Sequence, residues 1–194
     1  MKSFLKAAFL CTMALSLSSC AKLPSSGVGE RSTRVLFTIA FQQPINNNYV
    51  YFVALRPSKE SNPTENGPIP IVAPPWGNGF VGGEVTHFMR YSIDQFPNYQ
   101  LYEFTDDTLL NYRPIGIPIN YLNVNPGDRE LVFEIDLAQL APTLQDALEF
   151  KSLQVNILTM DRIPQGTSGN KNWDALGNGA LPSEINSPIT IPLQ

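Results

Sequence analysis

Cysteine is almost absent from this chain. Its two cysteines are Cys11 and Cys20, and no thiol follows residue 20. A fold built from the later residues therefore has no disulfide, no thiolate metal site and no cysteine nucleophile. Histidine is limited to His87. A zinc site would need carboxylates to complete it, and a serine triad, for which no G-x-S-x-G is present, would depend wholly on that one imidazole.

Basic residues are also in short supply. The chain has 13 Lys and Arg against 17 Asp and Glu, a formal charge of −4. An acidic chain lacks the electrostatic footprint of a nucleic-acid-binding protein, so no nucleic-acid partner is expected. The glycine-rich stretch 76–83 has neither the lysine nor the following helix of a phosphate-binding loop. The sequence accordingly predicts no cofactor, and it gives catalysis no positive support.

The amino terminus has the order of a signal peptide. Lys2 and Lys6 precede an uncharged run over residues 7–17. That run is too short to cross a bilayer, for which roughly 20 apolar residues are needed. We therefore expect residues 1–19 to be a cleaved signal, leaving 175 residues with 11 basic and 17 acidic side chains, a formal charge of −6.

The cleavage site carries a family resemblance. Leu17-Ser18-Ser19-Cys20 resembles the bacterial lipobox, which implies cleavage before Cys20, a diacylglyceryl group on its thiol and usually a third acyl chain such as palmitate. Two or three acyl chains make membrane attachment effectively permanent. Ala21 in place of Asp favours the outer membrane if the host has one. The alternative is an ordinary secreted protein with a chance cysteine near its cleavage site.

Beyond the lipidation site, residues 20–31 are polar and contain Pro, Gly and Ser, which predicts a flexible tether. Residues 32–194 then have the size of one domain. Apolar residues alternate, or run continuously, in segments typical of short strands, and turn residues separate them. We expect strands at 33–41, 49–55, 69–73, 85–93, 99–104, 109–115, 130–137, 153–160 and 189–193.

These strands predict the fold class. The first two are expected to pair as a hairpin across the Asn-rich segment 44–48, and the Pro-Gly-Asp turn at 126–128 introduces the cleanest alternation of the chain. One short helix is expected at 142–150. Strands without alternating helices predict an all-β antiparallel sandwich of seven to nine strands, jelly-roll or Ig-like. Residues 161–188 are expected to form a long loop.

Few side chains suggest a catalytic, metal-binding or ligand-binding role. His87 could be a general base or a metal ligand, but a buried histidine with one hydrogen-bond partner is the more ordinary interpretation. Asp106 and Asp107 could bind calcium or serve glycoside hydrolysis, or could simply be a solvated turn. Trp76, Tyr91 and Trp173 offer flat surfaces for stacking on sugars or apolar ligands, although strands often use aromatic residues for packing.

Three segments resemble uncharacterised bacterial lipoproteins: Pro-Pro-Trp-Gly-Asn-Gly at 74–79, Thr86-His87-Phe88, and Trp-Asp-Ala-Leu-Gly at 173–177. The strand series is loosely similar to carbohydrate-binding and DOMON-like sandwiches. Haem-binding members of that second group use Met and His as axial ligands, and this chain has Met89 beside His87. Nothing in the sequence places the two across a haem.

Three hypotheses follow for function. The first is a membrane-anchored, non-catalytic sandwich that binds an envelope protein or a glycan. The second is an envelope hydrolase that acts on glycans through Glu103, Asp106 or Asp107 together with His87. The third is a structural component of a surface assembly. In each, the protein is held to the cell envelope by its N-terminal lipid, on the periplasmic or the outer face.

Overall fold

The computed structural model describes residues 32–63, 66–161, 163, 170–176 and 188–193. These residues belong to the compact unit that spans Arg31–Gln194. The predicted signal peptide, lipidation site and tether lie outside them. Among the described residues there are twelve strands, one α-helix and one 3-10 helix, and every paired strand is antiparallel.

The smaller of the two packed sheets has the order β1-β9-β8. Its strands are β1 (Arg34–Ala40), β9 (Glu130–Asp136) and the short β8 (Asn120–Tyr121). The alternation seen in the sequence fixes which face of β9 is buried, because successive side chains point to opposite sides of a strand. Phe37 and Phe133 are register partners and stack with their ring centroids 4.8 Å apart.

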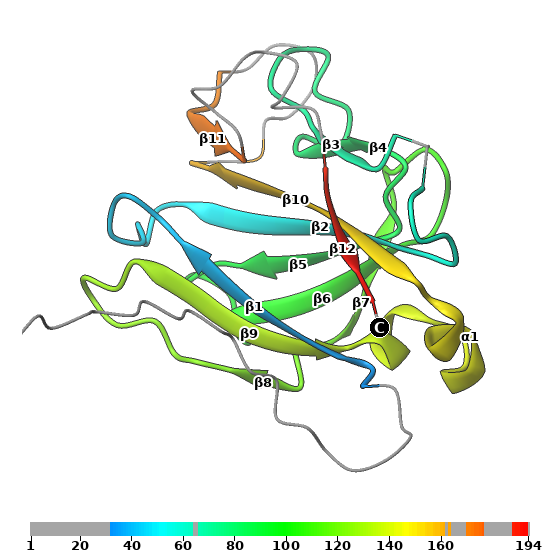
Figure 1. Cartoon of the computed structure of the whole chain (residues 1–194). Coiled ribbons are helices and arrows are strands. Elements are labelled where there is room, and N and C mark those ends of the chain that lie inside the picture. Colours follow the sequence, from blue (N-terminus) through cyan, green and yellow to red (C-terminus); the bar gives the residue numbers. More distant parts are fainter. Residues whose placement is uncertain (1–31, 64–65, 162, 164–169, 177–187, 194) are drawn as a thin grey trace, which may run out of the picture. The chain divides into compact units, whose positions relative to one another are not determined.

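The larger sheet has the order β11-β10-β2-β5-β6-β7, with β12 also paired to β10 (Figure 1). Its central strands are β2 (Val50–Ser58), β5 (His87–Tyr91), β6 (Tyr99–Phe104) and β10 (Ser152–Met160). The outer strands are β7 (Tyr112–Gly116), β11 (Trp173–Ala175) and β12 (Ile189–Pro192).

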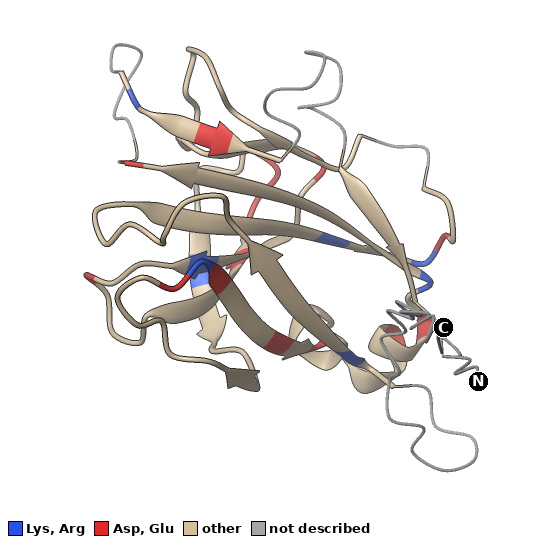
Figure 2. Cartoon of the chain, turned by 60° about the vertical axis from the view of Figure 1, so that its left-hand side comes forward, with Lys and Arg blue, Asp and Glu red and all other residues tan. Residues whose placement is uncertain are grey.

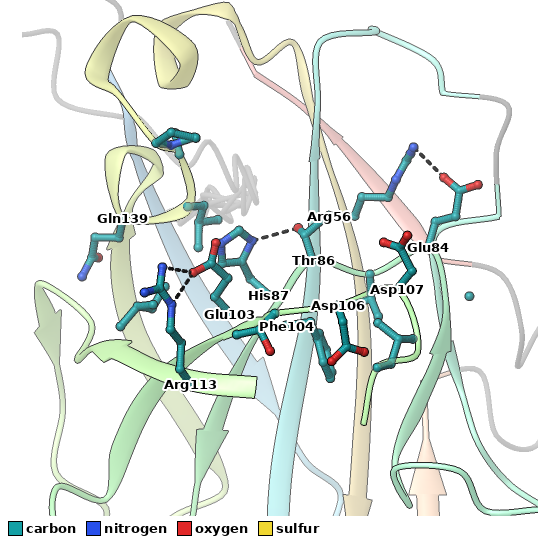
Figure 3. Close-up of a pocket in the computed structure, with 18 residues that line it drawn as sticks. Arg56, Glu84, Thr86, His87, Glu103, Phe104, Asp106, Asp107, Arg113 and Gln139 are labelled. Carbon is teal, nitrogen blue, oxygen red and sulfur yellow. Dashed lines mark hydrogen bonds and ion pairs between the residues drawn. The ribbon is translucent and has the colours of Figure 1, made fainter. Parts of the chain in front are cut away.

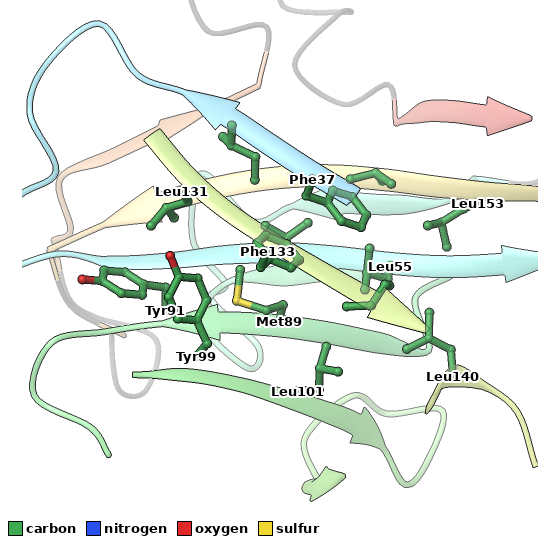
Figure 4. Packing of buried hydrophobic residues seen from close by; sticks show 14 of the residues in the cluster. Phe37, Leu55, Met89, Tyr91, Tyr99, Leu101, Leu131, Phe133, Leu140 and Leu153 are labelled. Atoms are coloured by element: carbon green, nitrogen blue, oxygen red, sulfur yellow. The ribbon is translucent and has the colours of Figure 1, made fainter. Parts of the chain in front are cut away.

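The main hydrophobic core lies between the two sheets (Figure 4). Inward residues of β1 and β9 meet those of β2, β5, β6 and β10, and many are fully buried. Met89 and Leu101 from the large sheet and Leu131 and Phe133 from the small sheet have no exposed surface. At roughly 25 cal/mol for each Å² of apolar surface removed from water, this layer supplies much of the driving force for folding.

A second core lies on the opposite face of the large sheet. The hairpin of β3 (Pro68–Pro70) and β4 (Val81–Gly83), with the loop between them, covers Phe52, Phe88 and Met160. Phe80 from this covering segment stacks on Phe52 with ring centroids 4.3 Å apart. Because the large sheet is covered on both faces, β2 is apolar from Val50 to Leu55 instead of alternating.

The helical elements close one end of the sandwich. A 3-10 helix, η1 (Leu137–Leu140), follows β9 directly, and Asp136 caps its first turn by accepting the Ala138 N–H at 2.9 Å. The helix α1 (Leu144–Glu149) follows, capped by Thr143. Capping of this kind satisfies amide groups that have no partner inside a helix. Among the described residues no helix is both long and apolar enough to span a bilayer.

The predicted all-β antiparallel sandwich with one short helix is confirmed. The expected hairpin of the first two strands is wrong: β1 pairs with β9 in the small sheet, whereas β2 lies between β10 and β5 in the large one. The strands differ in burial, since β1 buries one face and β2 buries both. The strand number exceeds seven to nine because several strands have only two or three residues, as in β3, β4, β8 and β11.

Candidate functional site

A cavity of about 1070 Å³ opens at the end of the sandwich where β2 and β9 finish and β5 begins. Its wall is built from the end of β2, the β4–β5 connection, the β6–β7 turn and the segment from η1 to Pro142. Figure 3 shows that side chains from these separate stretches point toward one space. Ligand pockets in proteins commonly have volumes of about 300–1,000 Å³, so the cavity has room for a small molecule or a short oligomer.

His87, the single histidine, lies in the wall of this cavity. It is 7% exposed, and its Nδ1 is 2.8 Å from the Thr86 hydroxyl. Burial lowers its pKa from 6.5 to about 4, and the negative charge of Glu103, its register partner on β6, offsets only part of that effect. The imidazole is therefore neutral at pH 7.

Two arginine–glutamate pairs flank the cavity. Arg113 donates two hydrogen bonds to one oxygen of Glu103, from Nε at 2.9 Å and from Nη2 at 2.7 Å. On the other side, Arg56 binds Glu84 at 2.8 Å through Nη2 and the Gln154 side chain at 2.8 Å through Nη1. These contacts bring four charged side chains to the cavity, where Arg113 and Glu84 remain largely exposed to solvent (Figure 3).

Gly83, at the end of β4, allows this strand to pass close to Gly67 at the start of the covering hairpin. Its φ of +74° lies in the left-handed region, and an added Cβ would overlap the Gly67 carbonyl oxygen. A side chain at this position would thus be excluded on two grounds. The glycine lets the chain turn from the covering hairpin into β5, which places Glu84, Thr86 and His87 at the cavity.

Asp106 and Asp107, the weak calcium candidates, also border the cavity. Asp106 is engaged in its own turn: it accepts the Thr108 N–H at 2.9 Å and the Thr108 hydroxyl, and its other oxygen accepts from Asn111 at 2.8 Å. These hydrogen bonds, that of the Thr108 hydroxyl first, lower the pKa of Asp106. Among the described residues no three His, Cys, Asp or Glu side chains gather as metal ligands.

The aromatic candidates are not in the cavity wall. Trp76 is 4% exposed, and the Lys171 ammonium lies 4.7 Å from the centre of its ring. Lys171 also donates to the Ile71 and Gly79 carbonyls, so it links the residues just before β11 to the loop between β3 and β4. Tyr91 is 2% exposed in the main core, and Trp173 packs against the second core. Burial leaves Trp76 and Tyr91 no free face on which a ligand could stack.

The structure also shows whether His87 and Met89 could serve as the two axial ligands of a haem. His87 and Met89 are two residues apart on one strand, so their side chains point to the same face, and Met89 is fully buried in the main core. Axial ligands must approach a haem from opposite sides. This pair therefore cannot serve as the two axial ligands of one haem.

Sequence reasoning singled out His87, Glu103, Asp106 and Asp107, and the structure brings all four to one cavity. It missed both arginines, together with Glu84 and Gln139. Arg56 follows the apolar run of β2, and a charged residue ending such a run signals only the edge of the core. No local motif joins it to Arg113, because the two reach the cavity from strands that are not adjacent in the sheet.

Comparison with models of known protein families, with curated proteins and with solved structures gives no match to this chain.

Proposed function

We propose that this chain is a lipid-anchored protein of the bacterial cell envelope, attached through Cys20, whose sandwich binds a glycan in the end cavity without catalysing a reaction. The observation that supports glycan binding is the chemistry of the cavity wall. It combines paired guanidinium and carboxylate groups, which are planar hydrogen-bonding groups, with the apolar side chains of Phe104, Leu109 and Leu140. The anchor is supported by the signal-like leader and the Leu-Ser-Ser-Cys sequence.

Sugars need such a wall. Their hydroxyls are both donors and acceptors, and carboxylates and guanidiniums that are already positioned bind them at a smaller cost in side-chain entropy than mobile ones. The Arg113–Glu103 and Arg56–Glu84 pairs supply both kinds of group at the cavity. The apolar residues of the wall can contact the C–H faces of the rings.

The same contacts argue against catalysis. The oxygens of Asp106 are taken by Thr108 and Asn111, and one oxygen of Glu103 is taken by Arg113. With a pKa of about 4, His87 is a weak base at neutral pH. A general acid and base pair needs groups poised to exchange protons near the working pH, and these groups are held for hydrogen bonding.

A glycan array probed with the purified protein tests the proposal. Glu103→Gln and Asp107→Asn should each weaken binding to any glycan that scores, by about 10- to 100-fold, because a hydrogen bond to a charged group contributes roughly 1.5–3 kcal/mol. Glu130→Gln is the matched control, since Glu130 is exposed at the far end of β9. Absence of binding to every glycan, or equal loss in the control, would refute the proposal.

One observation favours a hydrolase as a second candidate: His87, Glu103, Asp106 and Asp107 surround one cavity. Paired carboxylates about 5–9 Å apart can cleave glycosidic bonds. If the protein turns over a glycan that it binds, and Glu103→Gln or Asp107→Asn abolishes turnover while leaving binding measurable, the hydrolase replaces the binding protein. Binding without turnover across a broad panel of glycans excludes it.

A further inference from the structure

The cavity and the start of the described chain lie at the same end of the sandwich. Thr33, just before β1, accepts the Leu137 N–H at 2.7 Å, and Leu137 begins the 3-10 helix whose Gln139 and Leu140 line the cavity. Figure 1 shows β1 starting beside this helical end and running away from it. A tether preceding Ser32 therefore joins the sandwich next to the cavity.

Exposed apolar residues border the cavity at this end, although the opposite end also has them, with Phe96 98% exposed and Ile93 44% exposed. Leu110 follows the lining residue Leu109 and is 58% exposed, and Leu144 lies two residues beyond the lining residue Pro142 and is 61% exposed. Ile117 is 41% exposed, and its carbonyl accepts from the Gln139 side chain at 2.8 Å. Apolar side chains beside a polar cavity suit a surface that is apolar just below its headgroups.

We propose that the cavity end faces the bilayer to which the chain is anchored, and that the cavity takes the sugar headgroup of a neutral glycolipid in that bilayer. This inference rests on the proposed anchor and on the proposed glycan binding. The tether of residues 20–31 has 12 residues and spans at most roughly 40 Å when extended. It therefore keeps the cavity end within reach of the membrane surface and gives a membrane-bound sugar a high effective concentration.

The charge of the cavity decides the class of headgroup. Four carboxylates border it, those of Glu84, Glu103, Asp106 and Asp107, against the guanidiniums of Arg56 and Arg113. Both guanidiniums are already in ion pairs, and His87 is neutral. In Figure 2 basic and acidic residues are interspersed along the described ribbon. Phosphate headgroups would meet an excess of negative charge, whereas sugar hydroxyls can donate to these carboxylates.

The test uses the full lipidated protein in vesicles and two matched labelling sites. Ile117→Cys places a fluorophore at the cavity end, and Phe96→Cys places one on the β5–β6 turn at the other end, where Phe96 is 98% exposed. With Cys20 acylated, each variant has one free thiol. The vesicles contain phosphatidylcholine and a nitroxide-headgroup lipid, alone or with either glucosyl diacylglycerol or phosphatidylglycerol.

We expect several-fold stronger quenching at position 117 than at position 96, a further increase with glucosyl diacylglycerol only, and loss of that increase in Glu103→Gln. Equal quenching at both sites, stronger quenching at 96, or no response to the glucosyl lipid would overturn the inference. The glycan array separates the two proposals. Binding of free glycans with a failed vesicle test removes only the membrane orientation and the glycolipid, whereas a blank array removes the glycan site itself.

Discussion

Replacing Phe80 with alanine tests whether the covering segment is a packed part of the fold. Phe80 is 1% exposed, its ring stacks on Phe52 with an interplanar angle of 12°, and its centroid lies 4.9 Å from that of Phe88. It belongs to the second core, which seals one face of the large sheet. Truncation would remove its ring contacts with Phe52 and Phe88.

The expected cost is about 3–5 kcal/mol in the free energy of unfolding. Deleting a buried phenyl ring loses its transfer free energy and leaves a cavity that the neighbours fill only in part. Domains of this size are stable by about 5–15 kcal/mol, so the variant should stay folded with a clearly lower midpoint in urea. The melting temperature should fall by about 2–4 °C for each kcal/mol lost.

Phe96→Ala provides the control, because the same substitution is made at a side chain that is 98% exposed. It should change stability by less than about 0.5 kcal/mol. Urea unfolding of both variants, followed by circular dichroism, gives the comparison. If Phe80→Ala lowers the free energy of unfolding no more than Phe96→Ala does, the segment between β3 and β4 does not pack on the sheet and the second core does not form.

Further predictions concern single groups. The His87 pKa is lowered to about 4, so the folded state binds fewer protons than the unfolded state between about pH 4 and 6.5. The free energy of unfolding should therefore fall as the pH drops through that window. NMR titration of His87 measures the pKa directly. Burial lowers the Lys171 pKa to about 8, so stability should rise from about pH 8 to 10.5, a rise that Lys171→Met should abolish in denaturant titrations. Asp106→Ala removes the acceptor of the β6–β7 turn and should slightly lower the urea midpoint of unfolding. Cys20→Ser should remove the acyl mass in mass spectrometry and release the protein from the membrane fraction, and membrane retention of an unacylated variant would contradict the anchor.

Local patterns determined the longer strands and the fold class, but not the short strands β4, β8 and β11, the last of which lies in the segment 161–188 that was expected to be a loop. The alternation of Leu131, Phe133 and Ile135 comes from the pleat of a strand with one buried face, a property that needs no knowledge of the partner strand. The helix α1 was also foreseen, within two residues at its start and one at its end. Capping and turn chemistry act over a few residues, so they can be read from the sequence.

Tertiary structure decided which strands pair, which segment covers the second face of the large sheet, and which side chains meet at the cavity. The partner of β1 lies about a hundred residues away in β9, and nothing in the alternation of β1 distinguishes that partner from the neighbouring β2. The apolar run of β2 indicated burial on both faces but not that the segment around Phe80 provides the second cover. His87, Glu103, Arg56 and Arg113 meet because antiparallel register aligns the ends of separate strands. Sequence patterns record which side of a strand avoids water, whereas the identity of the group across from it depends on the packing of the whole chain.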